Sequence, residues 1–206
     1  MGRTVAVPRA GVEDNLRSLQ VERMDLVNLR LMNTDASGDL LAQQLGTLED
    51  LHGEGKLDLI GISEAGADAV GRALDLVDIA EVQNSYSVVN RSGEDVLELC
   101  MAREIAFVPY FPLGSAFSGG PSQLAQDPVI SGVAHRRGIT VTQVALAWLL
   151  ARYVRMLLIP GTSSVGTSRR TWPRRTSSST HTISPSSRKP PRWAIRSPLP
   201  TTDPCA

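Results

Sequence analysis

The sequence predicts an α/β protein with parallel strands joined by helical crossovers. Three observations support this: apolar residues recur at helical spacing in several segments, short runs rich in Val, Ile and Leu lie between them, and the two kinds of segment alternate about five times. Such alternation places a helix between successive parallel strands. It is compatible with an open doubly wound sheet or with a (β/α)8 barrel, although five units are too few to close eight strands.

The helices are predicted from apolar stripes. The clearest stripe consists of four leucines that fall on one face of a helix, Leu41, Leu45, Leu48 and Leu51. The last helix contains TQVALAWLLAR, which is apolar over most of its surface, as a well-packed helix should be. The predicted helices span 8–20, 40–54, 67–76, 94–103, 130–137 and 142–152.

The strands are predicted from short apolar runs between those helices. MDLVNLRL is too short for a helix of this kind and is rich in Leu and Val, and LDLIGI follows the helix-breaking GEGK. The predicted strands span 24–31, 57–62, 79–82, 105–109 and 156–159.

Composition divides the chain at about residue 165. Of 21 Lys/Arg and 21 Asp/Glu, segment 166–206 holds eight basic residues and one acid, which leaves 13 basic and 20 acidic residues in 1–165. That segment also contains 15 Ser or Thr and seven Pro, so it has too little apolar surface to fold alone. We therefore expect a folded domain over 1–165 and a disordered basic Ser/Arg/Pro tail over 166–206.

Two interpretations of the tail remain open. Basic tails bind nucleic acid through its phosphates, but this one lacks interleaved aromatic and basic residues, so a nucleic-acid partner is not expected. The alternative, which we favour, is a translational frame change near codon 165. With synonymous codons chosen freely, a two-base shift from Gly166 reads HLEENVAAADIVLDAH, which has an acidic first turn followed by an alanine-rich helix.

The remaining composition predicts a cytoplasmic protein without a membrane span. The two cysteines, Cys100 and Cys205, form neither a disulfide framework nor a metal-ligand pattern, which favours a reducing compartment and no metal site. No apolar run approaches the length of about 18 residues that a spanning helix needs, and the first residues lack the apolar core of a signal peptide.

Polar and aromatic side chains follow the predicted strands, where chemistry gathers in parallel α/β folds. Gln83 can both donate and accept hydrogen bonds, which suits a carboxamide. Tyr110 offers a flat face to a planar heterocycle. The GTSS stretch after the last strand presents backbone N–H groups and hydroxyls to an anion.

Taken together and in order, five segments resemble the aldo-keto reductase family: GKLDLIGISEAG, EVQNSYSVVNR, LELCMAREIAFVPYFPLGSAFSGG, GITVTQVALAWLLAR and LLIPGTSSV. The resemblance covers about residues 10–165. Members of this family are (β/α)8 barrels that use NADPH to reduce aldehydes and ketones. The resemblance therefore implies a partial TIM-type barrel of about five parallel strands rather than a doubly wound sheet.

The resemblance also implies an NADPH site. Ser63 and Gln83 would hold the nicotinamide carboxamide, and Tyr110 would stack on the nicotinamide ring. The pyrophosphate would lie along Phe111, Pro112, Leu113, Gly114 and Ser115, and the adenosine 2′-phosphate end would meet Gly161, Thr162 and Ser163. Two positions depart from the family pattern: Glu64 replaces the usual Asn, and Phe111 replaces a frequent Ser.

The family's catalytic Asp, Tyr, Lys and His have no counterpart in family form. The first three belong to strands that precede the region with which this chain begins, and Arg30 stands at the His position. An arginine stays protonated, so it can hydrogen bond a carbonyl oxygen but cannot serve as the proton-donating acid. The histidines of the predicted helices, His52 and His135, are interpreted as structural.

We expect an NADPH-dependent oxidoreductase of the aldo-keto reductase family that acts on a small aldehyde or ketone. Because the catalytic groups are missing, we expect this chain to be catalytically impaired. The alternative is a catalytically dead nucleotide-binding or interaction module that retains the residues of the NADPH site.

Overall fold

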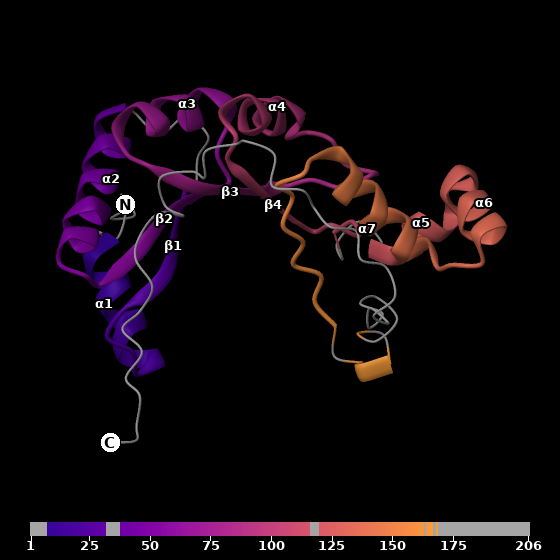
Figure 1. Ribbon diagram of the computed structural model, residues 1–206, viewed down its shortest axis with the longest axis horizontal. Coiled ribbons are helices and arrows are strands. Elements are labelled where there is room, and N and C mark those ends of the chain that lie inside the picture. Colours follow the sequence, from indigo (N-terminus) through magenta and orange to yellow (C-terminus); the bar gives the residue numbers. More distant parts are fainter. Residues whose placement is uncertain (1–7, 32–37, 116–119, 163, 167, 169–206) are drawn as a thin grey trace, which may run out of the picture. The chain divides into compact units, whose positions relative to one another are not determined.

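The computed structural model describes residues 8–31, 38–115, 120–162, 164–166 and 168, which all belong to the first of the two units of the chain, 1–171. The predicted tail lies outside the described residues from 169 onward. In the described part, four strands form a parallel sheet in the order β1-β2-β3-β4 (Figure 1). They are β1 (Met24–Arg30), β2 (Leu57–Ser63), β3 (Ile79–Ser85) and β4 (Ala106–Tyr110). The helices are α1 (Pro8–Leu19), α2 (Gly38–Gly53), α3 (Ala67–Leu76), α4 (Glu94–Arg103), α5 (Gly120–Gln126), α6 (Pro128–Arg137) and α7 (Val141–Arg152).

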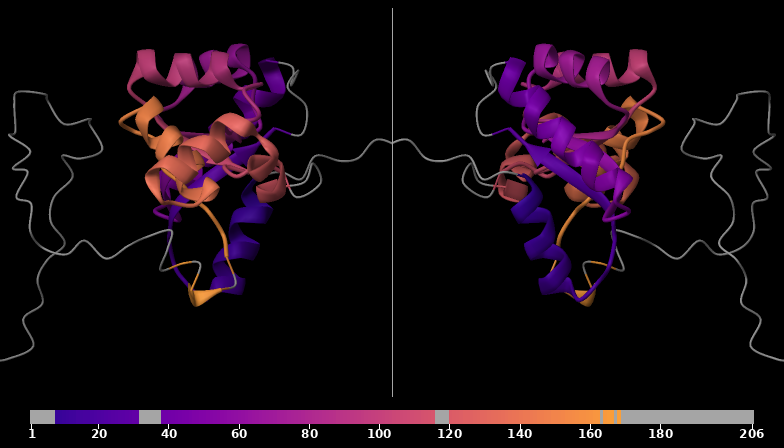
Figure 2. Two further views of the ribbon diagram at one scale, coloured as in Figure 1. Left: turned by 90° about the vertical axis from the view of Figure 1, so that its right-hand side faces the viewer. Right: turned by 90° about the vertical axis from the view of Figure 1, so that its left-hand side faces the viewer.

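One face of the sheet is apolar and covered by helices. Side chains alternate between the two faces of a strand, and the residues that point to this face include Ile62, Val82 and Phe107, all without exposed surface. Helices α2, α3 and α4 lie side by side along it (Figures 1 and 2). The leucine stripe predicted for the second helix is confirmed, since all four leucines are at most 1% exposed. Each such side chain contributes about 1.5–3 kcal/mol by burial.

The opposite face of the sheet carries polar groups. Asn28, Gly61 and Glu81 occupy neighbouring positions in β1, β2 and β3, because Asn28 pairs with Gly61 and Gly61 with Glu81. The Asn28 amide donates to a Glu81 carboxylate oxygen at 3.0 Å. A Cβ on Gly61 would lie 2.0 Å from Asn28 Oδ1 and 3.1 Å from Glu81 Cγ, so the side-chain pair crosses the sheet directly over a glycine.

The strand predicted over 156–159 is reduced to one bridge between Met156 and Phe107. The Phe107 N–H donates to the Arg155 carbonyl at 3.1 Å, and the Leu157 N–H donates to the Phe107 carbonyl at 2.9 Å. The next donor on this edge of β4 would be residue 109, a proline, which has no N–H. The parallel ladder therefore stops after one step, and four regular strands replace the five expected.

Other element boundaries also differ from the prediction. β3 continues to Ser85, so Gln83 lies inside a strand rather than after it. The short helix α5 was not predicted, because GPSQLAQ offers one large apolar residue and no periodicity. Helix α6 begins two residues earlier than expected, since Asp127 caps it by accepting hydrogen bonds from the backbone N–H groups of Val129 and Ile130 at 2.8 and 2.9 Å.

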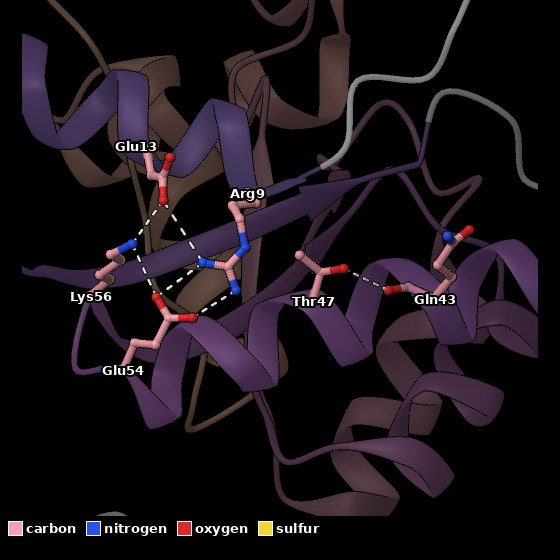
Figure 3. A network of polar contacts seen from close by, with 6 residues as sticks. All are labelled: Arg9, Glu13, Gln43, Thr47, Glu54 and Lys56. Atoms are coloured by element: carbon pink, nitrogen blue, oxygen red, sulfur yellow. Dashed lines mark hydrogen bonds and ion pairs between the residues drawn. The ribbon is translucent and has the colours of Figure 1, made fainter.

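A cluster of four charges joins α1 to the segment between α2 and β2 (Figure 3). Arg9 donates two hydrogen bonds to the Glu54 carboxylate, at 3.0 and 2.7 Å. Lys56 Nζ lies 2.7 Å from Glu13 and 3.0 Å from Glu54. Because Lys56 immediately precedes β2, this cluster ties the sheet at the amino-terminal end of the strand, away from the strand ends where ligands bind in such folds.

Candidate functional site

The predicted cofactor residues of three strands lie on one face of the sheet and at one end of it. Arg30 pairs with Ser63 across β1 and β2, Ser63 pairs with Gln83 across β2 and β3, and Ser85 pairs with Tyr110 across β3 and β4. Since alternate residues share a face, Ser63, Gln83 and Tyr110 all project to the side opposite the helices. The sheet thus assembles these three groups at its carboxyl-terminal edge.

Backbone hydrogen bonds fix the ends of these strands. The Ser63 carbonyl accepts from the Leu31 N–H at 2.9 Å, and the Gln83 carbonyl accepts from the Glu64 N–H at 3.0 Å. Ser63 is buried, whereas Gln83 and Tyr110 are half-buried. The side chains that were predicted to contact a cofactor therefore lie on a firmly paired part of the sheet, and Gln83 and Tyr110 remain partly open to solvent.

Glu64 connects two other strand ends. Its carboxylate oxygen Oε2 accepts from Arg30 Nε at 2.8 Å and lies 2.7 Å from Arg30 Nη2. The Glu64 carboxylate also lies within electrostatic range of the Tyr110 phenol at the end of β4. Burial raises the pKa of Tyr110, the Glu64 carboxylate raises it further, and the Arg30 guanidinium opposes the rise. The phenol therefore stays neutral at neutral pH.

The turn that carries Glu64 has an uncommon backbone conformation. Glu64 has φ 57°, in the left-handed region that costs a non-glycine residue of order 1 kcal/mol or more. Buried Asn84 stabilises the turn through two hydrogen bonds to Ala65. The Asn84 amide oxygen accepts from the Ala65 N–H at 3.1 Å, and the Asn84 amide nitrogen donates to the Ala65 carbonyl at 2.7 Å. Asn84 was not predicted as a site residue, although it follows Gln83 directly.

A polar hollow of about 180 Å³ lies beside Tyr110, between the loops that follow β3 and β4. Phe111, Gly114 and Ser115, which were predicted to meet the pyrophosphate, line it. The other lining residues were not predicted as site residues; they are Ser85, Ser87, Val89, Asn90 and Gln123. The motif EVQNSYSVVNR, however, contains the first four of them and was already quoted for the resemblance.

The loop after β4 is shaped by two residues with positive φ. Phe111 has φ 54° and Gly114 has φ 85°, and the Gly114 N–H donates to the Phe111 carbonyl at 2.9 Å. Pro112 is buried, and Leu113 packs against the hydrophobic core. These two residues therefore support the loop from inside, while Phe111, Gly114 and Ser115 face the hollow.

The third predicted group of cofactor residues is only partly described. Gly161 and Thr162 are exposed, and Thr162 Oγ1 accepts from the Ser164 N–H at 3.1 Å. Ser163 lies outside the described residues. Because the segment from Met156 pairs in parallel with β4, it leaves the sheet toward the carboxyl end of β4. Among the described residues, no hydrogen bond or ion pair joins Gly161 or Thr162 to Ser63, Gln83 or Tyr110.

The described residues contain no group of three or more His, Cys, Asp or Glu that could hold a metal ion. None of the helices in that part of the chain is long and apolar enough to cross a membrane. The His52 ring nitrogen Nδ1 lies 3.2 Å from the Leu57 carbonyl, which links the end of α2 to β2 and agrees with a structural role.

A family model described as aldo/keto reductase family matches residues 8–171. The chain belongs to the aldo/keto reductase family. Among curated proteins, this aldo-keto reductase is 40% identical over 157 residues to pyridoxine 4-dehydrogenase of Escherichia coli, covering 75% of this chain and 53% of that protein. It is 32% identical over 151 residues to an uncharacterized oxidoreductase of Schizosaccharomyces pombe, covering 73% of this chain and 47% of that protein.

The fold of this aldo-keto reductase also matches solved structures. An aldo/keto reductase of Klebsiella pneumoniae, crystallised in complex with NADP and acetate, superimposes with a TM-score of 0.69 at 29% identity, covering 81% of this chain and 58% of that one. The chain thus spans about half the length of the curated relatives that it matches. The prediction of an aldo-keto reductase with parallel strands of the TIM-barrel type is confirmed.

Proposed function

We propose that this chain binds NADPH at the carboxyl-terminal edge of its sheet. The observation that carries the proposal is that Ser63, Gln83 and Tyr110 project from three neighbouring strands to one face and one end of the sheet. The Klebsiella relative was crystallised with NADP, which supports the choice of nucleotide. The proposed cofactor-binding residues are Ser63, Gln83, Tyr110, Phe111, Pro112, Leu113, Gly114, Ser115, Gly161, Thr162 and Ser163.

Each group has a distinct role in this proposal. The Gln83 amide and the Ser63 hydroxyl can hold both the donor and the acceptor of a carboxamide. The half-buried ring of Tyr110 provides a stacking surface for nicotinamide. The hollow lined by Phe111, Gly114 and Ser115 receives the phosphates, while Gly161 to Ser163 receive the adenosine end. Pro112 and Leu113 act through the backbone of the loop that they support.

The reaction class that the family supports is reduction of a small aldehyde or ketone. Bound NADPH would supply the hydride. Of this chain's residues, Arg30 stands at the strand end where the family resemblance places a histidine, and a guanidinium does not give up a proton at neutral pH. Burial and the Glu64 carboxylate raise the pKa of Tyr110, which makes its phenol a weaker acid. We therefore propose that the purified chain turns over carbonyl compounds poorly.

The second candidate is a nucleotide-binding or interaction module without catalysis. The pairing of Arg30 with Glu64 and the raised pKa of Tyr110 favour it, because neither group then gives up a proton readily. The two candidates share the cofactor site and differ only in turnover. From cysteine usage, we propose a cytoplasmic location for either.

Fluorescence titration of the full chain with NADPH tests the proposed site, and the absorbance of NADPH at 340 nm with a small aldehyde tests turnover. We expect saturable binding that Tyr110→Leu weakens about tenfold, through loss of an aromatic stacking contact of about 1–1.5 kcal/mol. Tyr110→Phe should retain most of the affinity because it keeps the ring. Absence of saturable binding by the folded wild type would refute the proposal, and measurable turnover would exclude the module without catalysis.

A further inference from the structure

We infer that Arg30 binds the carbonyl oxygen of the substrate and that Glu64, by pairing with Arg30, makes the site select an uncharged carbonyl compound over a carboxylate. The inference rests on the proposed function, since it adds a substrate-oxygen subsite beside the proposed nicotinamide position. It concerns Arg30 and Glu64, which stand where the family resemblance places a His and an Asn.

The first support is the geometry of the guanidinium. Arg30 directs Nε and Nη2 at one oxygen of Glu64, at 2.8 and 2.7 Å. In the described part of the chain, Nη1 makes no hydrogen bond or ion pair, and the Arg30 side chain is 63% exposed. One edge of the planar group is therefore fixed while its other edge presents N–H donors to an incoming oxygen.

The second support is charge. A guanidinium beside a carboxylate forms a pair without net charge, so an anionic ligand that approaches Arg30 also meets the repulsion of Glu64. A carbonyl oxygen carries only a partial charge and escapes most of that repulsion. The pair thus retains hydrogen-bond donors while it removes the general attraction of a lone arginine for carboxylates.

The third support is how firmly Glu64 is placed. It is fixed by Arg30 and by a turn that buried Asn84 holds through both hydrogen bonds to Ala65. The Glu64 backbone has a left-handed φ of 57°, and this turn conformation is supported by the Asn84 hydrogen bonds. Glu64 therefore acts as a positioning residue, because it orients Arg30 without needing to touch the substrate.

A second pair in the same molecule provides a matched control. Glu104 also has φ 57°, and its carboxylate lies 3.2 Å from Arg155 Nη2. Glu104 stands just before β4, at the opposite end of the sheet from Tyr110. Glu104→Gln thus removes the same charge from the same kind of pair at a similar backbone conformation, but far along the strand from the proposed site.

The test compares two ligands of nearly equal shape, benzamide and benzoate, by ligand-observed NMR titration at pH 8. In the wild type we expect benzamide to bind at least as tightly as benzoate. Glu64→Gln should shift the ratio of the two dissociation constants toward benzoate by about fivefold or more, the size expected for removing a unit charge about 5 Å away in a largely hydrated site. Arg30→Gln should weaken both ligands, and Glu104→Gln should leave the ratio within twofold of wild type.

The inference is overturned if Glu64→Gln leaves the ratio unchanged, if Arg30→Gln binds both ligands as well as wild type, or if the folded wild type binds neither. Glu64→Asn removes the same charge with a shorter side chain and replaces Glu64→Gln if circular dichroism shows that the latter is unfolded. The titrations are run with and without NADPH, and NADPH affinity is measured separately. Normal cofactor binding without charge selectivity would reject the inference and leave the proposed function intact.

Discussion

Replacing Gly61 by alanine should destabilise the sheet strongly, because the position has no room for a side chain. The new Cβ would lie 2.0 Å from Asn28 Oδ1 and 3.1 Å from Glu81 Cγ, so the hydrogen bond between these residues must break or β2 must shift. Overpacking costs about 1–3 kcal/mol, and a hydrogen bond to a charged group about 1.5–3 kcal/mol. Because a rotation of Asn28 away from the new Cβ relieves the overpacking at the cost of its hydrogen bond, we expect Gly61→Ala to lower the free energy of unfolding by about 1.5–3 kcal/mol.

The assay is urea unfolding of the full chain followed by circular dichroism, with Gly46→Ala as the control. Gly46 is exposed within α2, and a Cβ there meets nothing within 4 Å, so its replacement should stabilise the protein by about 0.5–1 kcal/mol. Adding Asn28→Ala to Gly61→Ala removes the atom that clashes. The double variant should therefore be more stable than the sum of the single changes predicts, by about 1 kcal/mol or more. Additivity within about 0.5 kcal/mol would refute the reasoning.

Three further predictions concern other parts of the fold. Leu45→Ala, in the buried stripe of α2, should cost about 2–5 kcal/mol in the same urea assay, and a cost below 1 kcal/mol would contradict the observed packing. Hydrogen bonds from Arg9 and then Lys56 lower the pKa of Glu54 from 4.5 to about 2, so its stabilising effect should be present above pH 4.5 and be lost as the pH falls toward 2. Glu54→Gln should flatten the dependence of Tm on pH in that window, whereas Glu22→Gln, outside the cluster, should not. Burial raises the pKa of Cys100 to about 12. In a Cys205→Ser variant, the Cys100 thiol should therefore react with a disulfide reagent at pH 8 far more slowly in the native protein than in denaturant. Equal reaction rates would contradict its burial.

The alternation of helices and strands could be read from the sequence because both periodicities are strong in this chain. The leucine stripe of α2 and the run LDLIGIS follow the helical and strand patterns closely, and the structure places both as predicted. Tertiary context limited the other assignments. The segment 156–159 has the composition of a strand, but the absence of an N–H at Pro109 ends its ladder, and this effect arises on the neighbouring strand.

The candidate site could be predicted only where a single residue type carries the signal. Gln83 and Tyr110 stand out because an amide and an aromatic ring at strand ends are chemically distinctive. Ser85, Asn90 and Gln123 do not stand out, because ordinary polar residues in loops become a lining only when two loops fold beside each other. Gly61 shows the same limit, since its importance depends on a side chain 33 positions away in β1.

Arg30 and Glu64 stand where the family resemblance places a His and an Asn, and their effects on the site have to be considered together. Taken singly, an arginine adds a positive charge to the strand end, and a glutamate adds a negative charge beside the proposed carboxamide position. Either change alone would bias the site toward ligands of one charge. In the structure the two side chains neutralise each other at 2.7 Å. The electrostatic effect of each residue on the site therefore depends on the presence of the other, and restoring a neutral residue at only one of the two positions should disturb ligand binding more than restoring both.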